Sequence, residues 1–283
     1  MTFVRSPKQR LQAFLARVGI YERLRGSFLY DAYWRIADEQ IIAGRSLEVE
    51  FYRDVLKGLK RGDLIIDIGA NHGSKTDVFL RLGARVVAVE PDETNQEILR
   101  ERFLKLRLFP KPVVVVAKAV SDRNTVETMW VAEPGSAKNT LSRKWVDTLA
   151  EDGERFGEVL EFIGEKRVET TTVDQLMTEY GNPFFVKIDV EGFEPHVLRG
   201  MHLSVPYLSF EVNLPEFRPE GLECVDLLGR LSLDGTFNYA VDCRRGLTLT
   251  SWLNAQDFSR VLDACDEKSI EVFWRMSANR RPT

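Results

Sequence analysis

The 283-residue chain has only three cysteines, three histidines and no long apolar run. Cys224, Cys243 and Cys265 are odd in number and far apart, which excludes a disulfide framework and indicates buried thiols in a reducing compartment. So few histidines also exclude a His-rich metal site. No apolar run approaches the roughly 18–20 residues that cross a bilayer, and basic residues interrupt the N-terminus where a signal peptide needs an apolar core. We therefore expect a cytoplasmic protein without a transmembrane segment.

Two nucleotide-binding motifs are also missing. The dinucleotide fingerprint G-x-G-x-x-G is broken because Asn71 stands where its second glycine should be, and no G-x-x-x-x-G-K-[ST] motif is present. The composition, 44% hydrophobic and 29% charged, is that of a globular chain with a sizeable core. A net charge of -4 argues against nucleic acid as a partner.

The charge is unevenly distributed along the chain. Residues 1–30 carry six basic residues and one acid, whereas residues 147–169 carry eight acids and three bases. Aromatic and apolar positions at helical intervals predict a helical N-terminal cap over residues 1–61. We expect this cap to cover a binding pocket, contact a partner subunit or lie on an anionic surface. The acidic stretch is expected to belong to an exposed insertion at about residues 125–170.

Residues 62–283 show the alternation of strands and helices that is typical of a parallel α/β sheet. Short apolar runs predict buried strands, and the segments between them predict helices. Strands are expected at 64–68, 85–90, 112–120, 184–189, 207–212, 237–243 and 270–276, with a further one at 125–132. Helices are expected at 71–82, 92–106, 173–180, 195–201 and 222–233, the second of them capped by Asp92.

The strongest candidate site is the segment DIGANHG at residues 67–73, which follows the first strand. Its glycines let a ligand approach the backbone, and the helix that begins there offers unpaired N–H groups. Glu90 ends the second strand, where a carboxylate is placed to accept hydrogen bonds from a ribose diol. S-adenosylmethionine fits this combination better than NAD or FAD, because it carries a ribose but no pyrophosphate.

Several segments together resemble the FkbM-like S-adenosylmethionine-dependent methyltransferases. They are LIIDIGANHGSKT (64–76), VVAVEPDETN (86–95), KAVSD (118–122), VDQL (173–176), VKIDVEGFE (186–194) and FEVN (210–213). The resemblance runs in order over about residues 64–276. It implies a class I methyltransferase fold, an α/β, Rossmann-like sheet of seven mostly parallel strands with the last one antiparallel and helices on both faces. It also implies methyl transfer, usually to oxygen on a sugar or a natural-product-like acceptor.

The same resemblance implies which residues bind the cofactor. They are Asp67, Gly69, Asn71, Gly73, Glu90, Ser121 and Asp122. Asp67, Gly69 and Gly73 would hold the methionine end, and Glu90 would bind the ribose hydroxyls. Ser121 and Asp122 follow the third strand and would lie beside the adenine, although a turn or cap is an equal interpretation of Asp122.

The second candidate site contains Lys187, Asp189 and Glu191 at the end of the fourth strand. Alternation along an extended chain puts these side chains on one side, and a lysine in an apolar strand is expected to pair with a carboxylate. Asp189 is the preferred catalytic base for a hydroxyl acceptor, and Glu191 is the second choice. His72, in the cofactor loop, is a weaker candidate for the base. A network that only shapes the loop is the structural alternative.

A divalent metal is compatible with the sequence but not required by it. Asp189, Glu191 and either Glu211 or Asn213 offer hard oxygen ligands that suit Mg²⁺. Polar and basic residues between positions 138 and 144 are candidates to line the acceptor site.

The leading interpretation is an S-adenosylmethionine-dependent O-methyltransferase acting on a sugar, glycan or natural-product-like small molecule. A nucleotide-dependent oxidoreductase is one alternative, against which Asn71 argues. A non-catalytic methyltransferase-like module docked through its basic N-terminal helices is another. Peripheral membrane contact through residues 1–30 and a homo-oligomer are both compatible with the sequence, and no nucleic-acid partner is expected.

Overall fold

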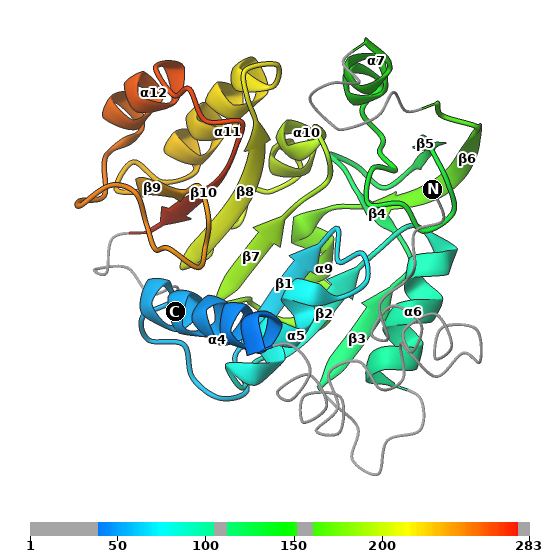
Figure 1. The fold of residues 1–283 in the computed structure, drawn as a ribbon, viewed down its shortest axis with the longest axis horizontal. Coiled ribbons are helices and arrows are strands. Elements are labelled where there is room, and N and C mark those ends of the chain that lie inside the picture. The colour runs from blue at the N-terminus through cyan, green and yellow to red at the C-terminus, as the bar shows by residue number, and fades with distance from the viewer. Residues whose placement is uncertain (1–38, 105–111, 152–160, 277–283) are drawn as a thin grey trace, which may run out of the picture.

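The computed structural model describes residues 39–104, 112–151 and 161–276, and its centre is a seven-stranded sheet (Figure 1). The strands lie in the order β3-β2-β1-β7-β8-β10-β9, and only β10 runs antiparallel to its neighbours. They are β1 (Leu64–Ile68), β2 (Arg85–Val89), β3 (Val113–Val116), β7 (Phe185–Ile188), β8 (Tyr207–Asn213), β9 (Thr236–Ala240) and β10 (Ser269–Arg275). This arrangement confirms the predicted class I methyltransferase sheet, including its last strand in reversed orientation.

Helices cover both faces of the sheet. One face packs against α4 (Glu39–Val55), α5 (Ser74–Arg81) and α6 (Glu93–Phe103). The other face packs against α9 (Val173–Tyr180), α10 (Glu194–Arg199), α11 (Arg218–Leu231) and α12 (Ala255–Asp263). Asp92 caps α6 as predicted, whereas α12 was not predicted. Within the described ranges, no helix combines the length and apolar character that crossing a membrane requires.

The two faces of the sheet follow from the two-residue period of each strand. In β1, Leu64 and Ile66 belong to the hydrophobic cluster on one face, and Ile65 belongs to the cluster on the other. Asp67 shares the face of Ile65, and Lys187 of β7 lies opposite Asp67 in the parallel register. Two charged side chains therefore lie side by side within an apolar sheet, which requires compensating groups around them.

The chain after β3 leaves the main sheet earlier than predicted. The strand expected at 112–120 ends at Val116, and Ala119–Val120 form a separate strand, β4. β4 pairs in parallel with β6 (Gly164–Thr171) in a second, three-stranded sheet. Because β4 belongs to the second sheet, the residues that follow Val120 continue from that sheet and not from the carboxyl end of β3.

The expected insertion contributes the rest of this second sheet. β5 (Val126–Val131) agrees with the strand predicted at 125–132 and lies antiparallel to β6. β6 itself was not predicted, because its sequence GEKRVETT is mostly polar and buries only Val168, Thr170 and Thr171. The insertion also contains α7 (Arg143–Glu151), while residues 152–160 lie outside the described residues.

The described part of the N-terminal segment packs directly on the main sheet. Tyr52 of α4 is fully buried, and its ring centroid lies 5.2 Å from that of Phe79 and 6.1 Å from that of Phe273. α4 thus shares a hydrophobic core with α5 and β10. The division into a cap (1–61) and a methyltransferase domain (62–283) stays a prediction, and the basic residues 1–30 lie outside the described residues.

We predict that Tyr52→Ala lowers the free energy of unfolding by about 3–5 kcal/mol, because it leaves a cavity between α4 and the sheet. Urea denaturation followed by circular dichroism measures the change. Leu233→Ala is the control, since this side chain is 92% exposed and its truncation should cost at most about 0.5 kcal/mol. Equal effects of the two substitutions would show that α4 does not stabilise the domain.

Candidate active site

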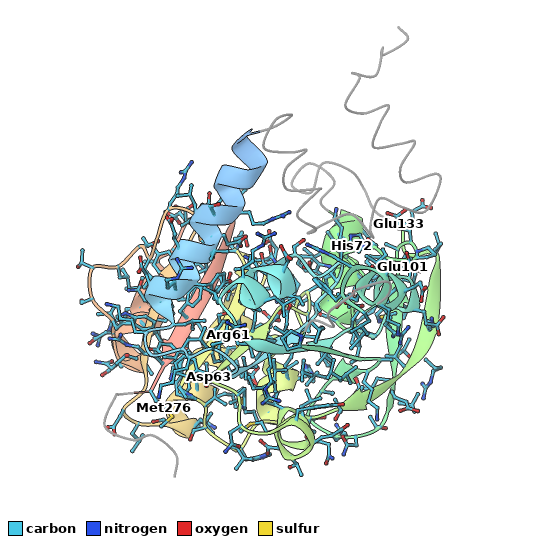
Figure 2. The ribbon with its side chains drawn as sticks, turned by 90° about the horizontal axis from the view of Figure 1, so that it is seen from below. Arg61, Asp63, His72, Glu101, Glu133 and Met276 are labelled. Atoms are coloured by element: carbon cyan, nitrogen blue, oxygen red, sulfur yellow. The ribbon has the colours of Figure 1, made fainter. Side chains whose placement is uncertain are left out.

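The candidate site residues gather at the carboxyl ends of β1, β2, β7 and β8. Ligands of open α/β sheets bind at this edge, because the loops that leave neighbouring strands meet there. Figure 2 labels His72 and Glu133 near each other, and Arg61 and Asp63, which precede β1, at a distance from them.

Asp67 and Gly69 set the geometry of the loop that leaves β1. The Asp67 carboxylate is buried and accepts a hydrogen bond of 2.6 Å from the Thr76 hydroxyl of α5. Burial raises the pKa of Asp67, and the Lys187 ammonium and the Thr76 hydrogen bond act against that rise. Gly69 has a φ of 78°, and a Cβ there would lie 1.8 Å from the carbonyl oxygen of Asp189. The backbones leaving β1 and β7 therefore touch, and only glycine allows this.

Glu90 is held after β2 by two backbone N–H groups. Asn71 donates to its Oε2 at 2.8 Å and Asp92 donates to its Oε1 at 2.9 Å. Burial nevertheless raises the pKa of Glu90 to about 7. Asn71 has a φ of 48°, a left-handed conformation that asparagine tolerates. The loop after β1 and the carboxylate after β2, which were both predicted to bind the cofactor, are therefore in direct contact.

A narrow cavity of about 60 Å³ lies beside Glu90 and is also lined by Gly69 and Asn71. The segment 136–141 closes one side of it. Asn139 donates to Asp92 at 3.1 Å, and the Thr140 hydroxyl donates to the Glu191 carbonyl at 2.8 Å. Of the residues between 138 and 144 that were predicted to line an acceptor site, Asn139 and Thr140 border the cavity next to Glu90, together with Leu141.

Sequence reasoning missed another wall of the same cavity. This wall consists of Lys118, which precedes β4, of Ala119 and Val120 in β4, and of Met129 in β5. Residues 118–120 belong to the segment KAVSD that carries the family resemblance, but only their packing around the cavity shows that they line it.

The structure does not bring Ser121, Asp122 or His72 to the cavity wall. The Ser121 hydroxyl is buried and donates to Glu127 at 2.8 Å, and Asp122 pairs with Arg123 at 2.9 Å. Both follow β4, which has already left the main sheet. His72 is held by its backbone, since its carbonyl accepts a hydrogen bond of 2.7 Å from Arg102.

Gly73 is used for helix packing. It precedes α5 with a φ of 75°, and a Cβ there would lie 2.4 Å from the ring of Phe103 in α6. The residue therefore lets the two helices approach each other at the edge of the sheet, and it does not line the cavity beside Glu90.

Lys187 and Asp189 form the ion pair expected from the sequence. Lys187 is buried, and its Nζ lies 2.7 Å from Oδ2 of Asp189. Burial acts to lower the pKa of Lys187, but the carboxylates of Asp189, Glu271 and Asp67 outweigh it and raise the pKa. Burial acts to raise the pKa of Asp189, but the ammonium outweighs it and lowers the pKa. Asp189 is therefore an ionised carboxylate of low basicity.

Glu191 and Glu211 join Asp189 in a carboxylate cluster. One oxygen from each residue lies within 4.8 Å of the others, and the Ser269 hydroxyl donates to Glu211 at 2.6 Å. Burial and then the Asp189 charge raise the pKa of both glutamates, that of Glu211 to about 8. Carboxylates this close do not all ionise near neutral pH, so the cluster retains a proton or is neutralised by a cation. Three hard oxygen donors also fit Mg²⁺ without requiring it.

A larger cavity of about 670 Å³ lies on the other side of Asp189. Asp189 lines both cavities, and Glu211 lines the larger of the two. The remaining walls come from α4, the start of α5, Arg102 of α6, Lys187 of β7, β10, and the end of β9 with the chain after it. These parts are far apart in the sequence, and only packing brings them together, which is why the sequence did not predict this cavity.

The domain is a class I methyltransferase domain. Three features define it, namely the strand order, the glycine loop after β1 and the buried acid after β2. A family model described as the methyltransferase FkbM domain matches residues 67–228. Because this match covers more than half of the chain, the protein belongs to the FkbM methyltransferase family.

Ribosomal RNA small subunit methyltransferases share short segments with the chain. The chloroplastic protein of Arabidopsis thaliana is 32% identical over 82 residues, which are 28% of this chain and 24% of that protein. Ribosomal RNA small subunit methyltransferase A of Thermotoga petrophila is 44% identical over 48 residues, 17% of this chain and 18% of that protein. The chain thus matches less than a quarter of the length of these two relatives.

Solved methyltransferase structures match the whole domain at low identity. The plantazolicin methyltransferase BpumL in complex with SAH has a TM-score of 0.43 and 9% identity, with 95% of this chain and 99% of that chain covered. Precorrin-6y C5,15-methyltransferase from Geobacter metallireducens has a TM-score of 0.39 and 11% identity, with 84% and 89% covered. At TM-scores below 0.5 the strand order, and not these likenesses, carries the fold assignment.

We predict that Lys187→Met lowers the free energy of unfolding by about 3–5 kcal/mol at pH 8, because it leaves the carboxylates of Asp67, Asp189 and Glu271 without their shared cation. The loss should be smaller at pH 5. Without the ammonium, burial raises the pKa of these carboxylates above their unfolded values, so stability is present at low pH and lost as the pH rises. Urea denaturation at the two pH values measures this.

Lys144→Met is the matched control for that substitution. Lys144 pairs with Glu220 at 2.7 Å but is 44% exposed, so its loss should cost at most about 1 kcal/mol at either pH. A penalty for Lys187→Met that grows toward low pH would contradict the proposed charge balance.

Proposed function

We propose that the protein is an S-adenosylmethionine-dependent methyltransferase that transfers a methyl group to a hydroxyl oxygen of a sugar, glycan or natural-product-like small molecule. The observation that carries this proposal is the meeting of the Asn71 N–H and the Glu90 carboxylate beside Gly69. Membership of the FkbM methyltransferase family supports it. The acceptor is proposed to be a small molecule or glycan and not a nucleic acid.

The chain's own residues fit the cofactor at this edge. The Glu90 carboxylate has lone pairs beyond the two used by the backbone, and these suit the two ribose hydroxyls. Gly69 lines the cavity beside Glu90, and it lets the backbone after β7 approach the loop after β1 at the place proposed for the methionine end. When bound, the cofactor supplies an electrophilic methyl group. A cavity of about 60 Å³ is below the roughly 300 Å³ of typical small-molecule sites, so segment 136–141 has to move outward for entry.

We assign removal of the acceptor proton to the carboxylate cluster of Asp189, Glu191 and Glu211. A hydroxyl oxygen that gains a methyl group must lose its proton to a nearby base. Lys187 neutralises Asp189, so we propose that Asp189 positions the acceptor between the two cavities and does not take its proton. Glu211 lines the larger cavity, and a pKa of about 8 suits a base that works near neutral pH. We therefore assign proton acceptance to Glu211, with Glu191 as its coupled neighbour, in preference to Asp189.

The two alternatives have less support. In a nucleotide-dependent oxidoreductase the pyrophosphate would approach the loop after β1, where the Asn71 N–H is already bonded to the Glu90 carboxylate. A second negative charge at this point would be repelled. A non-catalytic module would not need the buried cluster of Asp189, Glu191 and Glu211, which is costly to maintain without a role.

We predict that Glu90→Ala raises the dissociation constant for S-adenosylhomocysteine at least tenfold, because the ribose hydroxyls lose their acceptor. Isothermal titration calorimetry on the full chain measures it. Asp257→Ala is the control and should change the constant less than twofold, since Asp257 lies on α12 and outside the cavity. Wild-type protein that binds no S-adenosylhomocysteine would overturn the proposal, and thermal protection by NAD alone would favour the oxidoreductase.

A further prediction concerns the protonation of the carboxylate cluster. Carbon-detected NMR of side-chain carboxyl groups should show a glutamate that titrates near pH 8 and is missing from Glu211→Gln. Asp189 should stay ionised from pH 5 to 9, because the Lys187 ammonium lowers its pKa. The assignment of Glu211 as the base fails if Asp189 titrates near pH 8 while Glu211 is already ionised.

A further inference from the structure

The turn that leaves β7 carries two of the three clustered carboxylates, and its backbone is unusual at one of them. Glu191 has a φ of 53°, in the left-handed region that disfavours a residue with a Cβ. Such a conformation persists only where the surrounding structure holds it, and it is often found at functional sites. The contacts around Glu191 therefore show what keeps its side chain beside Asp189 and Glu211.

Glu194 of α10 holds the two N–H groups that flank Glu191. Its Oε1 accepts a hydrogen bond from the Val190 N–H at 3.1 Å and from the Gly192 N–H at 3.4 Å. The Glu194 side chain is buried, and a buried carboxylate is costly unless donors surround it. One carboxylate oxygen thus fixes the peptide groups before and after Glu191.

Thr140 holds the carbonyl side of the same turn. Its hydroxyl donates to the Glu191 carbonyl at 2.8 Å, and the Val190 carbonyl lies 3.4 Å away. The hydroxyl also accepts from the Ser142 N–H at 2.9 Å, which directs its proton toward the turn. Thr140 is itself fixed by backbone hydrogen bonds to Trp130 of β5. Side chains of α10 and of the insertion therefore hold Glu191 from two sides.

The position of Glu191 matters because it belongs to the carboxylate cluster. One of its oxygens lies within 4.8 Å of oxygens of Asp189 and Glu211. Burial raises the pKa of Glu191, and the charges of Asp189, Glu211 and Glu194 raise it further. If the turn relaxed, the Glu191 carboxylate would leave these charges and Glu211 would lose its coupled neighbour.

Thr140 also connects this turn to the cofactor cavity. It lies in segment 136–141, which closes one side of the cavity and has to move outward for entry. That movement would break the hydrogen bond from Thr140 to the Glu191 carbonyl. Closure of a segment over a ligand commonly completes a catalytic arrangement.

We infer that Thr140 and Glu194 are positioning residues that hold Glu191 in the carboxylate cluster, and that closure of segment 136–141 over the cofactor completes this hold. The part that concerns closure rests on the proposed function. The inference gives the insertion a part in arranging the proton-accepting group, although it contributes no carboxylate to the cluster.

Carbon-detected NMR of carboxyl groups measures the hold on Glu191. The full chain is titrated without cofactor and with EDTA, and Glu191→Gln assigns the Glu191 signal. Thr140→Val removes the hydroxyl but keeps the shape of the side chain. It should lower the pKa of Glu191 by about 1 pH unit or more, because the carboxylate moves away from neighbouring charges. Thr140→Ser keeps the hydroxyl and should retain the wild-type titration.

A second pair of variants separates the hydrogen bonds of Glu194 from its charge. Glu194→Ala and Glu194→Gln both remove the charge, but only glutamine keeps an oxygen that accepts from the Val190 and Gly192 N–H groups. A difference between the two variants therefore reports the hydrogen bonds alone. We expect the pKa of Glu191 to be lower in Glu194→Ala than in Glu194→Gln by about 1 pH unit.

The part of the inference that concerns closure is tested by the association rate of S-adenosylhomocysteine, measured by stopped-flow fluorescence. Thr140→Val should raise this rate about fivefold, the usual worth of one hydrogen bond, and Thr140→Ser should not change it. Thr148→Val is the matched control, because the Thr148 hydroxyl bonds to the Lys144 carbonyl at 2.8 Å within α7, outside both cavities. It should behave as the wild type in both measurements, and circular dichroism verifies that all variants fold.

The outcomes separate this inference from the proposed function. The hold on Glu191 is refuted if Thr140→Val and Thr140→Ser titrate alike, or if Glu194→Ala and Glu194→Gln do. The part that concerns closure is refuted if Thr140→Val binds S-adenosylhomocysteine at the wild-type rate. Failure of S-adenosylhomocysteine to bind the wild type overturns the proposed function, while the titrations, made without cofactor, still decide whether Thr140 and Glu194 hold Glu191.

Discussion

The buried ammonium of Lys187 is the interaction on which the arrangement of the site depends. It is paired with Asp189 at 2.7 Å and lies near the carboxylates of Asp67 and Glu271, so one cation compensates acids of β1 and β10 and the acid that follows β7. Such a group is stable only with well-placed partners, because burial removes the solvation that water would give. The same compensation fixes Asp189 as an ionised group at the carboxyl edge of β7. Burial raises the pKa of Glu191 and Glu211 beside it, and the persistent Asp189 charge raises it further.

The two cavities meet at Asp189, and different layers of the fold build each of them. The smaller cavity lies between the loops after β1 and β2 and the second sheet, whose segment 136–141 is fastened to Asp92 and to the Glu191 carbonyl. The larger cavity depends on α4, whose Tyr52 packs in the core and also bonds to Glu271. Helix α4 therefore stabilises the fold through Tyr52, and the same side chain holds Glu271 in the wall of the larger cavity.

Local sequence signals predicted the main sheet and the loop after β1, because buried parallel strands are continuous apolar runs and glycines mark the close approach at Gly69. The pairing of Lys187 with a carboxylate also followed from the cost of burying a lone charge. The sequence did not predict β6, because its side chains are mostly polar. The places of Ser121 and Asp122 beside the adenine stay predictions, and both residues follow β4, which pairs with β6 outside the main sheet.

By itself, the sequence determined the strand pattern, the family resemblance and the chemistry of the loop after β1, since these depend on residues that are neighbours in the chain. Tertiary structure decided which carboxylate is suited to take a proton. Asp189 and Glu211 have similar side chains, and they differ because Lys187 neutralises one while burial and the neighbouring Asp189 charge keep the other weakly acidic. Tertiary structure also formed the larger cavity, because Glu48, Lys75 and Glu271 come from distant segments that only packing brings together.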